Sequence, residues 1–282
     1  MKISDIKQNL SNVRVMGVLN ITPDSFSDGG VHYSLLSSLS TAQKMIDAGV
    51  YVIDVGGEST RPGADVISSS EELARTIPVI QSIREKFPDV IISIDTYKSL
   101  VAEKALQSGA NWINDISGGT FSENMFEIAA KYDANIIISH IKGTPKDMQK
   151  NPHYEDVVGE ICSWLEEQAR KAQHCGIEAE KIIIDPGIGF GKRYEDNIII
   201  LRNLDKFKSP GYKVLIGTSR KSFIGHYTGE KDPSKRDAGS YITFIWAAAF
   251  GVDFIRVHNV PGTMQALRMA DALLDGDISL NS

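Results

Sequence analysis

Cysteine and long apolar runs are both scarce in this sequence. Its 282 residues include only two cysteines, Cys162 and Cys175, which fall in one helical stretch, so neither a disulfide framework nor a zinc site is expected. No window reaches about 18 uninterrupted apolar residues, so no membrane span is predicted. The first residues also lack the apolar core of a signal peptide. These absences predict a soluble, cytoplasmic protein.

Positive charge is in short supply as well. Lys and Arg total 30 against 36 for Asp and Glu, a net charge of −6, and this balance does not favour a nucleic-acid partner. An anionic ligand would therefore have to meet a local cluster of cations. The hydrophobic content of 42% is sufficient for a large core. Without a linker or low-complexity tract, we expect one domain over residues 1–282, with residues 1–12 covering the bottom of the fold.

Short apolar runs recur along the chain, and most are rich in Ile and Val without clean alternation, as is typical of parallel strands buried on both faces. The runs are Val13–Asn20, Tyr51–Val55, Val90–Asp95, Trp112–Asp115, Asn135–His140, Lys181–Asp185, Lys213–Ser219 and Phe254–His258. Helix-like segments separate most of these runs and follow the last: Ser34–Ala48, Glu71–Lys86, Lys98–Ser108, Glu123–Lys131, Tyr154–Cys175, Glu195–Phe207, Ser234–Phe250 and Pro261–Leu274.

This alternation of strand and helix predicts a single (β/α)8 barrel. A doubly wound open sheet is the alternative. No GxGxxG motif opens the first helix, and polar residues follow nearly every strand rather than those at one switch point. Both observations favour the barrel, whose active site would lie at the carboxyl ends of the strands.

Hydrogen-bond acceptors follow the third, fourth and sixth predicted strands, at Asp95, Asn114 and Asp185. A pocket of two carboxylates and a carboxamide suits a flat heterocycle rich in N–H donors. Either carboxylate alone could equally cap the next helix. The combination with Asn114 favours a ligand.

Cations follow the seventh and eighth predicted strands. Arg220 and Lys221 open one loop, while Arg256 and His258 share one face of a strand because they are two residues apart. The loops after these strands commonly hold phosphate in (β/α)8 barrels, so we expect an anion site here. The alternative for His258 is a structural histidine at a strand end.

Three further features of the strand ends have less specific interpretations. Asn20 ends the first strand, and an oxygen ligand beside a phosphate site suits Mg²⁺, although a solvated loop is the alternative. Alternating glycines in the stretch 187–191 would let a flat ring approach the backbone or would form an ordinary turn. His140 could act as a general base, but a lone strand-end histidine is more often structural.

Two long segments, MGVLNITPDSFSDGG (Met16–Gly30) and DVGGESTRPGA (Asp54–Ala64), resemble the signature segments of the dihydropteroate synthase family. Shorter matches follow in the family's order: Ser93–Thr96, Asn114–Gly119, Asp185–Lys192, Ser219–Gly225 and Arg256–His258. The resemblance implies a TIM barrel that condenses 6-hydroxymethyl-7,8-dihydropterin diphosphate with 4-aminobenzoate. It also implies Mg²⁺ as cofactor, a homodimer, and an aminobenzoate site that sulfonamides would occupy.

Roles for individual residues are implied by the same resemblance. Pterin would bind Asp95, Asn114, Asp185 and Lys221, diphosphate would bind Thr60, Arg256 and His258, and 4-aminobenzoate would lie against Arg61, Phe190 and Ser222. Mg²⁺ would sit at Asn20, and the catalytic residues would be Asp24, Asp28, Arg61, Asp95 and Lys221, the first two on a mobile loop with Phe26. The chain departs from the family pattern at Ser139-His140-Ile141, where Met-His-Met is common, and at Asn259, where Asp is common.

Two other functions share this barrel and pterin pocket. A methyltetrahydrofolate-dependent corrinoid methyltransferase has no diphosphate to bind, so the cations at Arg61, Lys221 and Arg256 argue against it. A lapsed paralogue that binds pterin without turnover usually loses loop or anion residues, and none is missing here.

Overall fold

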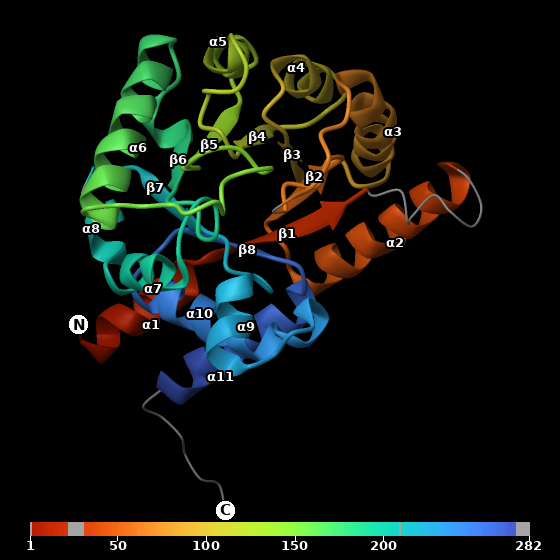
Figure 1. Cartoon of the computed structure of the whole chain (residues 1–282). Coiled ribbons are helices and arrows are strands. Elements are labelled where there is room, and N and C mark those ends of the chain that lie inside the picture. The colour runs from red at the N-terminus through yellow and green to blue at the C-terminus, as the bar shows by residue number, and fades with distance from the viewer. Residues whose placement is uncertain (1, 22–30, 62, 209, 275–282) are drawn as a thin grey trace, which may run out of the picture.

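The chain folds into one closed barrel of parallel strands surrounded by helices (Figure 1). The computed structural model describes residues 2–21, 31–61, 63–208 and 210–274. The strands are β1 (Arg14–Asn20), β2 (Val52–Gly56), β3 (Ile91–Asp95), β4 (Trp112–Asp115), β5 (Asn135–Ser139), β6 (Ile182–Asp185), β7 (Lys213–Ile216) and β8 (Phe254–Val257). They follow each other around the barrel in sequence order, and β8 pairs with β1. The predicted (β/α)8 barrel is confirmed.

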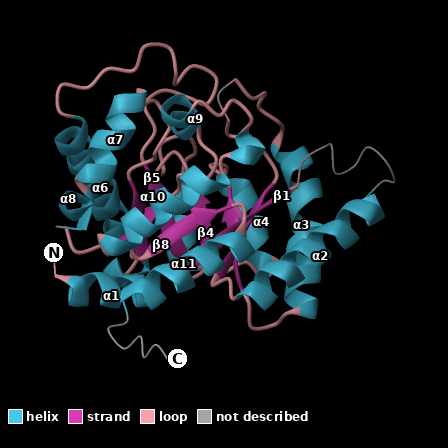
Figure 2. Ribbon diagram, turned by 90° about the horizontal axis from the view of Figure 1, so that it is seen from below, coloured by secondary structure: helices cyan, strands magenta, loops and turns pink. Residues whose placement is uncertain are grey.

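Helices surround the strands in Figure 1, and Figure 2 shows helices on both sides and in front of the strands, with loops across the top. They are α1 (Ile3–Asn12), α2 (Val31–Ala48), α3 (Ser69–Lys86), α4 (Ser99–Gln107), α5 (Met125–Lys131), α6 (Val157–His174), α7 (Tyr194–Arg202), α8 (Leu204–Lys208), α9 (Ser222–Thr228), α10 (Asp237–Ala249) and α11 (Val260–Leu274). Single 3-10 turns precede β6 at Ala179–Lys181 and α10 at Pro233–Lys235.

Two helical segments differ from the sequence-based expectation. The segment expected as one helix over Glu195–Phe207 is divided at Asn203, which leaves helical geometry with φ −123° and ψ 33°. The short helix α9 was not expected. It has only seven residues and ends at Gly229, whose φ of 77° is left-handed, so it is too brief to show a helical period.

The strands separate two apolar cores because successive side chains point to opposite faces of the barrel wall. The larger core lies between the wall and the helices. The smaller one fills the lower interior and consists of Met16, Val52, Trp112, Ile137, Ile183, Leu215 and Phe254. Within this smaller core the rings of Trp112 and Phe254 meet edge to face, 5.3 Å apart between centroids. We call the seven residues of the smaller core the apolar floor.

On four strands, the next inward-facing residue after the apolar floor is polar. Two residues after Val52, Trp112, Ile183 and Phe254 of the apolar floor, the strands carry Asp54, Asn114, Asp185 and Arg256 respectively. Residues two apart in a strand face the same side, so these polar side chains also point into the barrel. The interior therefore changes from apolar to ionic toward the carboxyl ends of the strands.

Helix α1 lies against α10 and α11, where Leu10 is buried and Asn9 Nδ2 donates to the carbonyl oxygen of Ala249 at 2.9 Å. That residues 1–12 cover the bottom of the barrel, within one domain over the whole chain, stays a prediction. Among the described residues, no helix combines the length and the apolar character needed to span a bilayer.

We expect Phe254→Ala to lower the free energy of unfolding by about 3–5 kcal/mol, because it removes a buried ring from the apolar floor and leaves a cavity. Urea denaturation measures the change. Leu36→Ala on α2 serves as the control, since Leu36 is 65% exposed and its truncation should cost no more than about 0.5 kcal/mol. Equal losses in both variants would contradict a packed barrel interior.

Candidate active site

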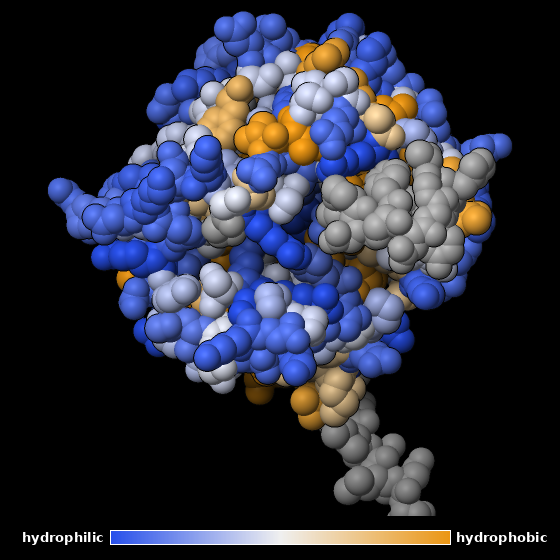
Figure 3. Space-filling model, turned by 45° about the vertical axis from the view of Figure 1, so that its right-hand side comes forward, coloured by the Kyte–Doolittle hydropathy of each residue, from blue (hydrophilic) through white to orange (hydrophobic). Residues whose placement is uncertain are grey.

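The carboxyl ends of the first four strands present their side chains in one register. Asn20 of β1 pairs with Gly56 of β2, Gly56 pairs with Asp95 of β3, and Asp95 pairs with Asn114 of β4. A Cβ at Gly56 would lie 3.3 Å from Asn20 Oδ1, so glycine here leaves room between the neighbouring polar groups. The structure thus brings together three of the residues predicted from the strand ends. The face in Figure 3 is largely hydrophilic and is hollowed near its centre.

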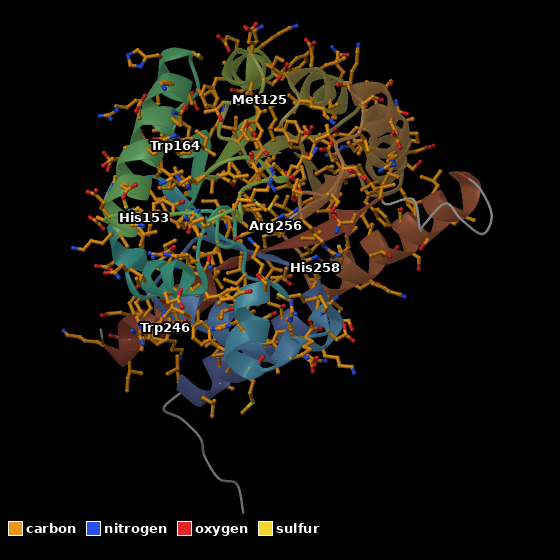
Figure 4. The ribbon with its side chains drawn as sticks, in the orientation of Figure 1. Met125, His153, Trp164, Trp246, Arg256 and His258 are labelled. Carbon is orange, nitrogen blue, oxygen red and sulfur yellow. The ribbon has the colours of Figure 1, made fainter. Side chains whose placement is uncertain are left out.

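Arg256 connects the acceptors and the cations that the sequence places after different strands. Its Nε donates to Asp54 Oδ2 at 2.6 Å and its Nη2 to Asp95 Oδ2 at 2.5 Å, across the barrel from β8 to β2 and β3. Donors and acceptors that follow different strands are therefore in direct contact. Figure 4 places Arg256 and His258 near the centre of the ring of helices.

Asp54 is a site residue that sequence reasoning missed. It is fully buried in β2, where it was interpreted as part of an apolar run. Its Oδ2 also accepts a hydrogen bond from Asn114 Nδ2 at 3.0 Å. The available signal was a carboxylate in the middle of a buried strand, since such a group needs a charged or hydrogen-bonding partner inside the fold.

Burial is the largest influence on the pKa of both Asp95 and Asp185. It raises the pKa of Asp95 to about 7, an effect that Arg256 opposes and the carboxylate of Asp54 reinforces. Burial likewise raises the pKa of Asp185, against the lowering effect of Lys221 and of the Gly187 amide, which donates to Asp185 Oδ1 at 2.8 Å. Neither carboxylate caps the following helix, so the helix-cap alternative does not describe them.

Lys221 packs against the glycine-rich loop that follows β6. The Lys221 ammonium donates to the carbonyl oxygen of Ile188 and lies 4.5 Å from the centre of the Phe190 ring. Burial lowers the pKa of Lys221 to about 8, while the carboxylate of Asp185 raises it. A cation, an aromatic face and a carboxylate predicted from separate motifs therefore meet. Ser222 lies at the exposed start of α9 directly after Lys221.

Lys192 is a second residue that sequence reasoning missed. Its side chain is almost fully buried, and its Nζ lies 3.0 Å from His140 Nδ1 and 3.0 Å from the Phe190 carbonyl oxygen. Burial first, and then the Lys192 charge, lower the pKa of His140 to about 2. His140 is therefore a weak base with a structural partner, and its ring packs edge to face on Trp164 at 5.0 Å.

His258 is surrounded by positively charged side chains. Its Nδ1 lies 2.9 Å from Ser219 Oγ, and burial lowers its pKa to about 3 with the help of four cations. Those cations are Arg256, Arg220, Arg61 and Lys221, in decreasing order of effect. A neutral imidazole surrounded by cations favours the binding of an anion.

Arg220, which the sequence places beside the expected anion site, is paired with a carboxylate of the chain. Its guanidinium makes two hydrogen bonds to Asp237, at 2.6 and 2.9 Å, and its φ of 58° places it in a left-handed turn. Asn259 also donates to Asp237, at 3.0 Å, and to the Tyr241 hydroxyl at 2.8 Å. A carboxylate at position 259 would face that of Asp237, so the amide suits this chain's own surroundings.

The loop that carries Thr60 and Arg61 is anchored at its base. Glu58 is buried and accepts hydrogen bonds from Lys98 Nζ and from the Tyr97 hydroxyl, the latter at 2.6 Å. Lys98 Nζ also donates to Glu72 Oε2 at 2.7 Å. Beyond this anchor Thr60 is half-buried and the Arg61 side chain is exposed, so the loop holds both residues near the mouth with freedom at its tip.

The Mg²⁺ prediction depends on Asn20, whose side chain is exposed at the end of β1. Among the described residues no cluster of three or more His, Cys, Asp or Glu side chains could hold a metal ion by itself. One exposed amide oxygen fits an ion that takes one or two protein ligands and completes its shell with phosphate oxygens and water. Asp24, Phe26 and Asp28 lie outside the described residues.

Comparison with known proteins identifies close relatives over nearly the whole chain. The family model "Pterin binding enzyme" matches residues 16–258. Dihydropteroate synthase of Synechocystis sp. is 48% identical over 92% of this chain and 89% of its own length. A Yersinia pestis dihydropteroate synthase solved with a sulfonamide drug complex superposes with a TM-score of 0.87 at 40% identity, covering 94% of this chain and 95% of that one. The Xanthomonas albilineans enzyme in complex with 7,8-dihydropteroate gives 0.83 at 34%, with the same coverage.

The raised pKa of Asp95 predicts how stability depends on pH. The folded carboxyl titrates near pH 7, whereas the unfolded one releases its proton near pH 4, so this group's contribution to the free energy of unfolding decreases as pH rises through that window. We expect Asp95→Asn to flatten the decrease in urea denaturation of the ligand-free protein. Asp65→Asn, at an exposed loop carboxylate, should leave it unchanged. Parallel curves for all three proteins would contradict the raised pKa.

Proposed function

This chain belongs to the dihydropteroate synthase family of pterin-binding enzymes, and on that premise we propose how its barrel mouth performs the family's reaction. It is a transferase that condenses 6-hydroxymethyl-7,8-dihydropterin diphosphate with 4-aminobenzoate to give 7,8-dihydropteroate and diphosphate, a step of folate biosynthesis. The observation that carries the site assignment is the junction of buried acceptors with a cluster of cations at Arg256. The substrate has the same polarity, with a ring rich in N–H donors at one end and an anion at the other.

We assign the pterin ring to Asp95, Asn114, Asp185 and Lys221. Carboxylate oxygens accept the N–H groups of the ring, and burial strengthens these hydrogen bonds because water competes less. Lys221 supplies a donor for a ring acceptor from beside Asp185, whose charge raises the pKa of the lysine. Two buried carboxylates near the ring also favour positive charge on it.

We assign the diphosphate to Thr60, Arg256 and His258. Arg256 keeps Nη1 free of hydrogen-bond partners within the described part of the chain, because Nε and Nη2 are held by Asp54 and Asp95. His258 has its Nδ1 on Ser219, which leaves Nε2 for an anion. The cations that lower the pKa of His258 supply the charge that attracts the diphosphate.

We assign 4-aminobenzoate to Arg61, Phe190 and Ser222. The exposed Arg61 guanidinium can pair with a carboxylate, and the half-buried Phe190 ring offers an aromatic face beside Lys221. Ser222 adds a hydroxyl at the start of α9. This side of the mouth is the more open one, which fits a second substrate that enters after the first.

Catalysis in this assignment follows from electrostatics and orientation. As diphosphate leaves, the exocyclic carbon of the pterin becomes positive, and Asp95 stabilises that charge. The cations around His258, which include Arg61 and Lys221 besides Arg256, stabilise the leaving group through their field. The aryl amine attacks the carbon held in front of it, and its weak basicity means that no strong general base is needed. The proposed catalytic set also includes Asp24 and Asp28.

Mg²⁺ completes the proposal at Asn20. The ion would be held by the Asn20 amide oxygen together with substrate phosphate oxygens, and it would supply Lewis-acid stabilisation of the leaving diphosphate. Asn20 lies two strands from Asp95 in the register of the barrel, so the metal side and the pterin side of the substrate would be neighbours.

A homodimer in the cytoplasm is also proposed. The supporting observation is a group of exposed apolar side chains on the neighbouring helices α7, α9 and α10: Tyr194, Ile199, Tyr227, Ile242 and Trp246. Figure 4 places Trp246 away from Arg256, so a partner on this face would leave the barrel mouth open.

Release of diphosphate that depends on 4-aminobenzoate is the test of the function. We expect the purified chain with Mg²⁺ to release diphosphate from the pterin diphosphate only when 4-aminobenzoate is added, and to form 7,8-dihydropteroate in equal amount. A lapsed paralogue would bind pterin without turnover. A corrinoid methyltransferase would bind methyltetrahydrofolate and ignore diphosphate. Either result would refute the synthase.

Asp185→Asn tests the pterin assignment. The variant keeps an oxygen that can accept from the Gly187 amide but loses the charged acceptor, so we expect pterin affinity to weaken by about 1–3 kcal/mol. Calorimetry with the pterin measures the change. Asp205→Asn, at an exposed position of α8, is the control. Asp196 would not serve, because its side chain is buried. Equal affinity in the wild type and Asp185→Asn would remove Asp185 from the pterin site.

A further inference from the structure

Asp54 lies between the two substrate sites without belonging to either assignment. It projects from the inner face of β2 and is fully buried. One of its oxygens, Oδ2, accepts from Asn114 Nδ2 at 3.0 Å and from Arg256 Nε at 2.6 Å. A single carboxylate oxygen therefore holds a residue assigned to the pterin and a residue assigned to the diphosphate.

The contact with Asp54 determines which end of the Asn114 amide faces the substrate. A carboxamide has a donor end and an acceptor end, whereas an ionised carboxylate only accepts. Asn114 must therefore turn its NH₂ group toward Asp54, and its carbonyl oxygen is left for an N–H donor of the ring. Without Asp54 the amide could flip and offer a donor where the ring also has donors.

The same carboxylate sets the plane of Arg256. The guanidinium is planar, so hydrogen bonds from Nε to Asp54 and from Nη2 to Asp95 fix its orientation and leave Nη1 for the anion. Burial lowers the pKa of the half-buried Arg256 guanidinium, but the charges of Asp54 and Asp95 more than offset this effect. Within the described residues Asp54 Oδ1 has no hydrogen-bond partner, so every hydrogen bond of the side chain serves these two residues.

We propose that Asp54 is a positioning residue that orients Asn114 for the pterin and Arg256 for the diphosphate, and so couples the two subsites. The inference deepens the proposed function and rests on it. It explains why a charge is buried in the middle of a strand that otherwise carries apolar residues: a neutral side chain could not accept both hydrogen bonds and also pair with the arginine.

Asp54→Asn is the direct test, because it preserves shape but can present a donor to Asn114 and removes the charge opposite Arg256. Calorimetry uses two separate probes, 6-hydroxymethyl-7,8-dihydropterin without diphosphate, and inorganic pyrophosphate with Mg²⁺. We expect the affinity for each probe to fall about tenfold, the loss typical of one charge-assisted hydrogen bond. A loss for one probe alone, or for neither, would overturn the coupling.

Ser93→Ala is the matched control. Ser93 pairs in register with Asp54 on the adjacent strand β3 and is equally buried, and its hydroxyl has no hydrogen-bond partner among the described residues. This variant disturbs the same level of the barrel, so unchanged affinities show that the loss in Asp54→Asn is not a general response to altering the interior. A tenfold loss in Ser93→Ala as well would refute the specific role.

A double-mutant cycle separates positioning from structural damage. In an Asn114→Ala background, Asp54→Asn should no longer weaken binding of the pterin probe, because the amide that it orients is absent, but it should still weaken binding of pyrophosphate. An undiminished effect on the pterin probe would overturn the proposal. Wild-type turnover with 4-aminobenzoate, measured in parallel, shows whether the proposed function itself holds.

A second variant keeps the proposal testable if Asp54→Asn does not fold. Asn114→Asp would place a carboxylate against that of Asp54, and one of the two would have to bind a proton. The affinity for the pterin probe should then decrease more steeply with rising pH than it does in the wild type. Identical pH profiles would show that the two side chains do not act on each other.

Discussion

Arg256 and the two carboxylates that share its guanidinium, Asp54 and Asp95, are the interaction on which the rest of the site depends. Charges removed from water are strongly unfavourable unless they are paired, and each member of this group satisfies the others. The group also lies where the acceptor-rich strands β2 to β4 and the cation-rich end of β8 meet. Its ionic bonds therefore stabilise the folded barrel and orient the groups that would contact a polar substrate.

The barrel geometry makes this arrangement possible. Because strands alternate their faces, a residue two positions beyond a member of the apolar floor also points inward, and four strands place a polar group there. The outer faces of the same strands stay apolar and pack on the helices. Each strand thus contributes to stability through its lower and outer residues and to the site through its last inward residue.

Much of the fold was predictable because parallel buried strands and amphipathic helices leave strong periodic signals. The strand-end residues Asp95, Asn114 and Asp185 could be located from these signals alone. Asp54 was recognisable only as a carboxylate inside a buried strand. The contacts of Asp54 and Lys192 could not be predicted, because they are made with residues distant in the chain. The pairing of Arg220 with Asp237 has a similar cause, since the two residues meet only when α10 packs against the turn that carries Arg220.

The apolar floor gives the ionic mouth a direction. Beneath Asp54, Asn114, Asp185 and Arg256 the interior is closed by hydrocarbon and aromatic rings, which form a medium of low polarity. Exposed residues such as Asn20 lie at the carboxyl ends of the strands. Field lines from the buried charges are thereby concentrated toward the open end of the barrel rather than spread through the protein. The apolar floor thus screens the lower end of the barrel from these charges, and an approaching dianion would be attracted only from the side of the mouth.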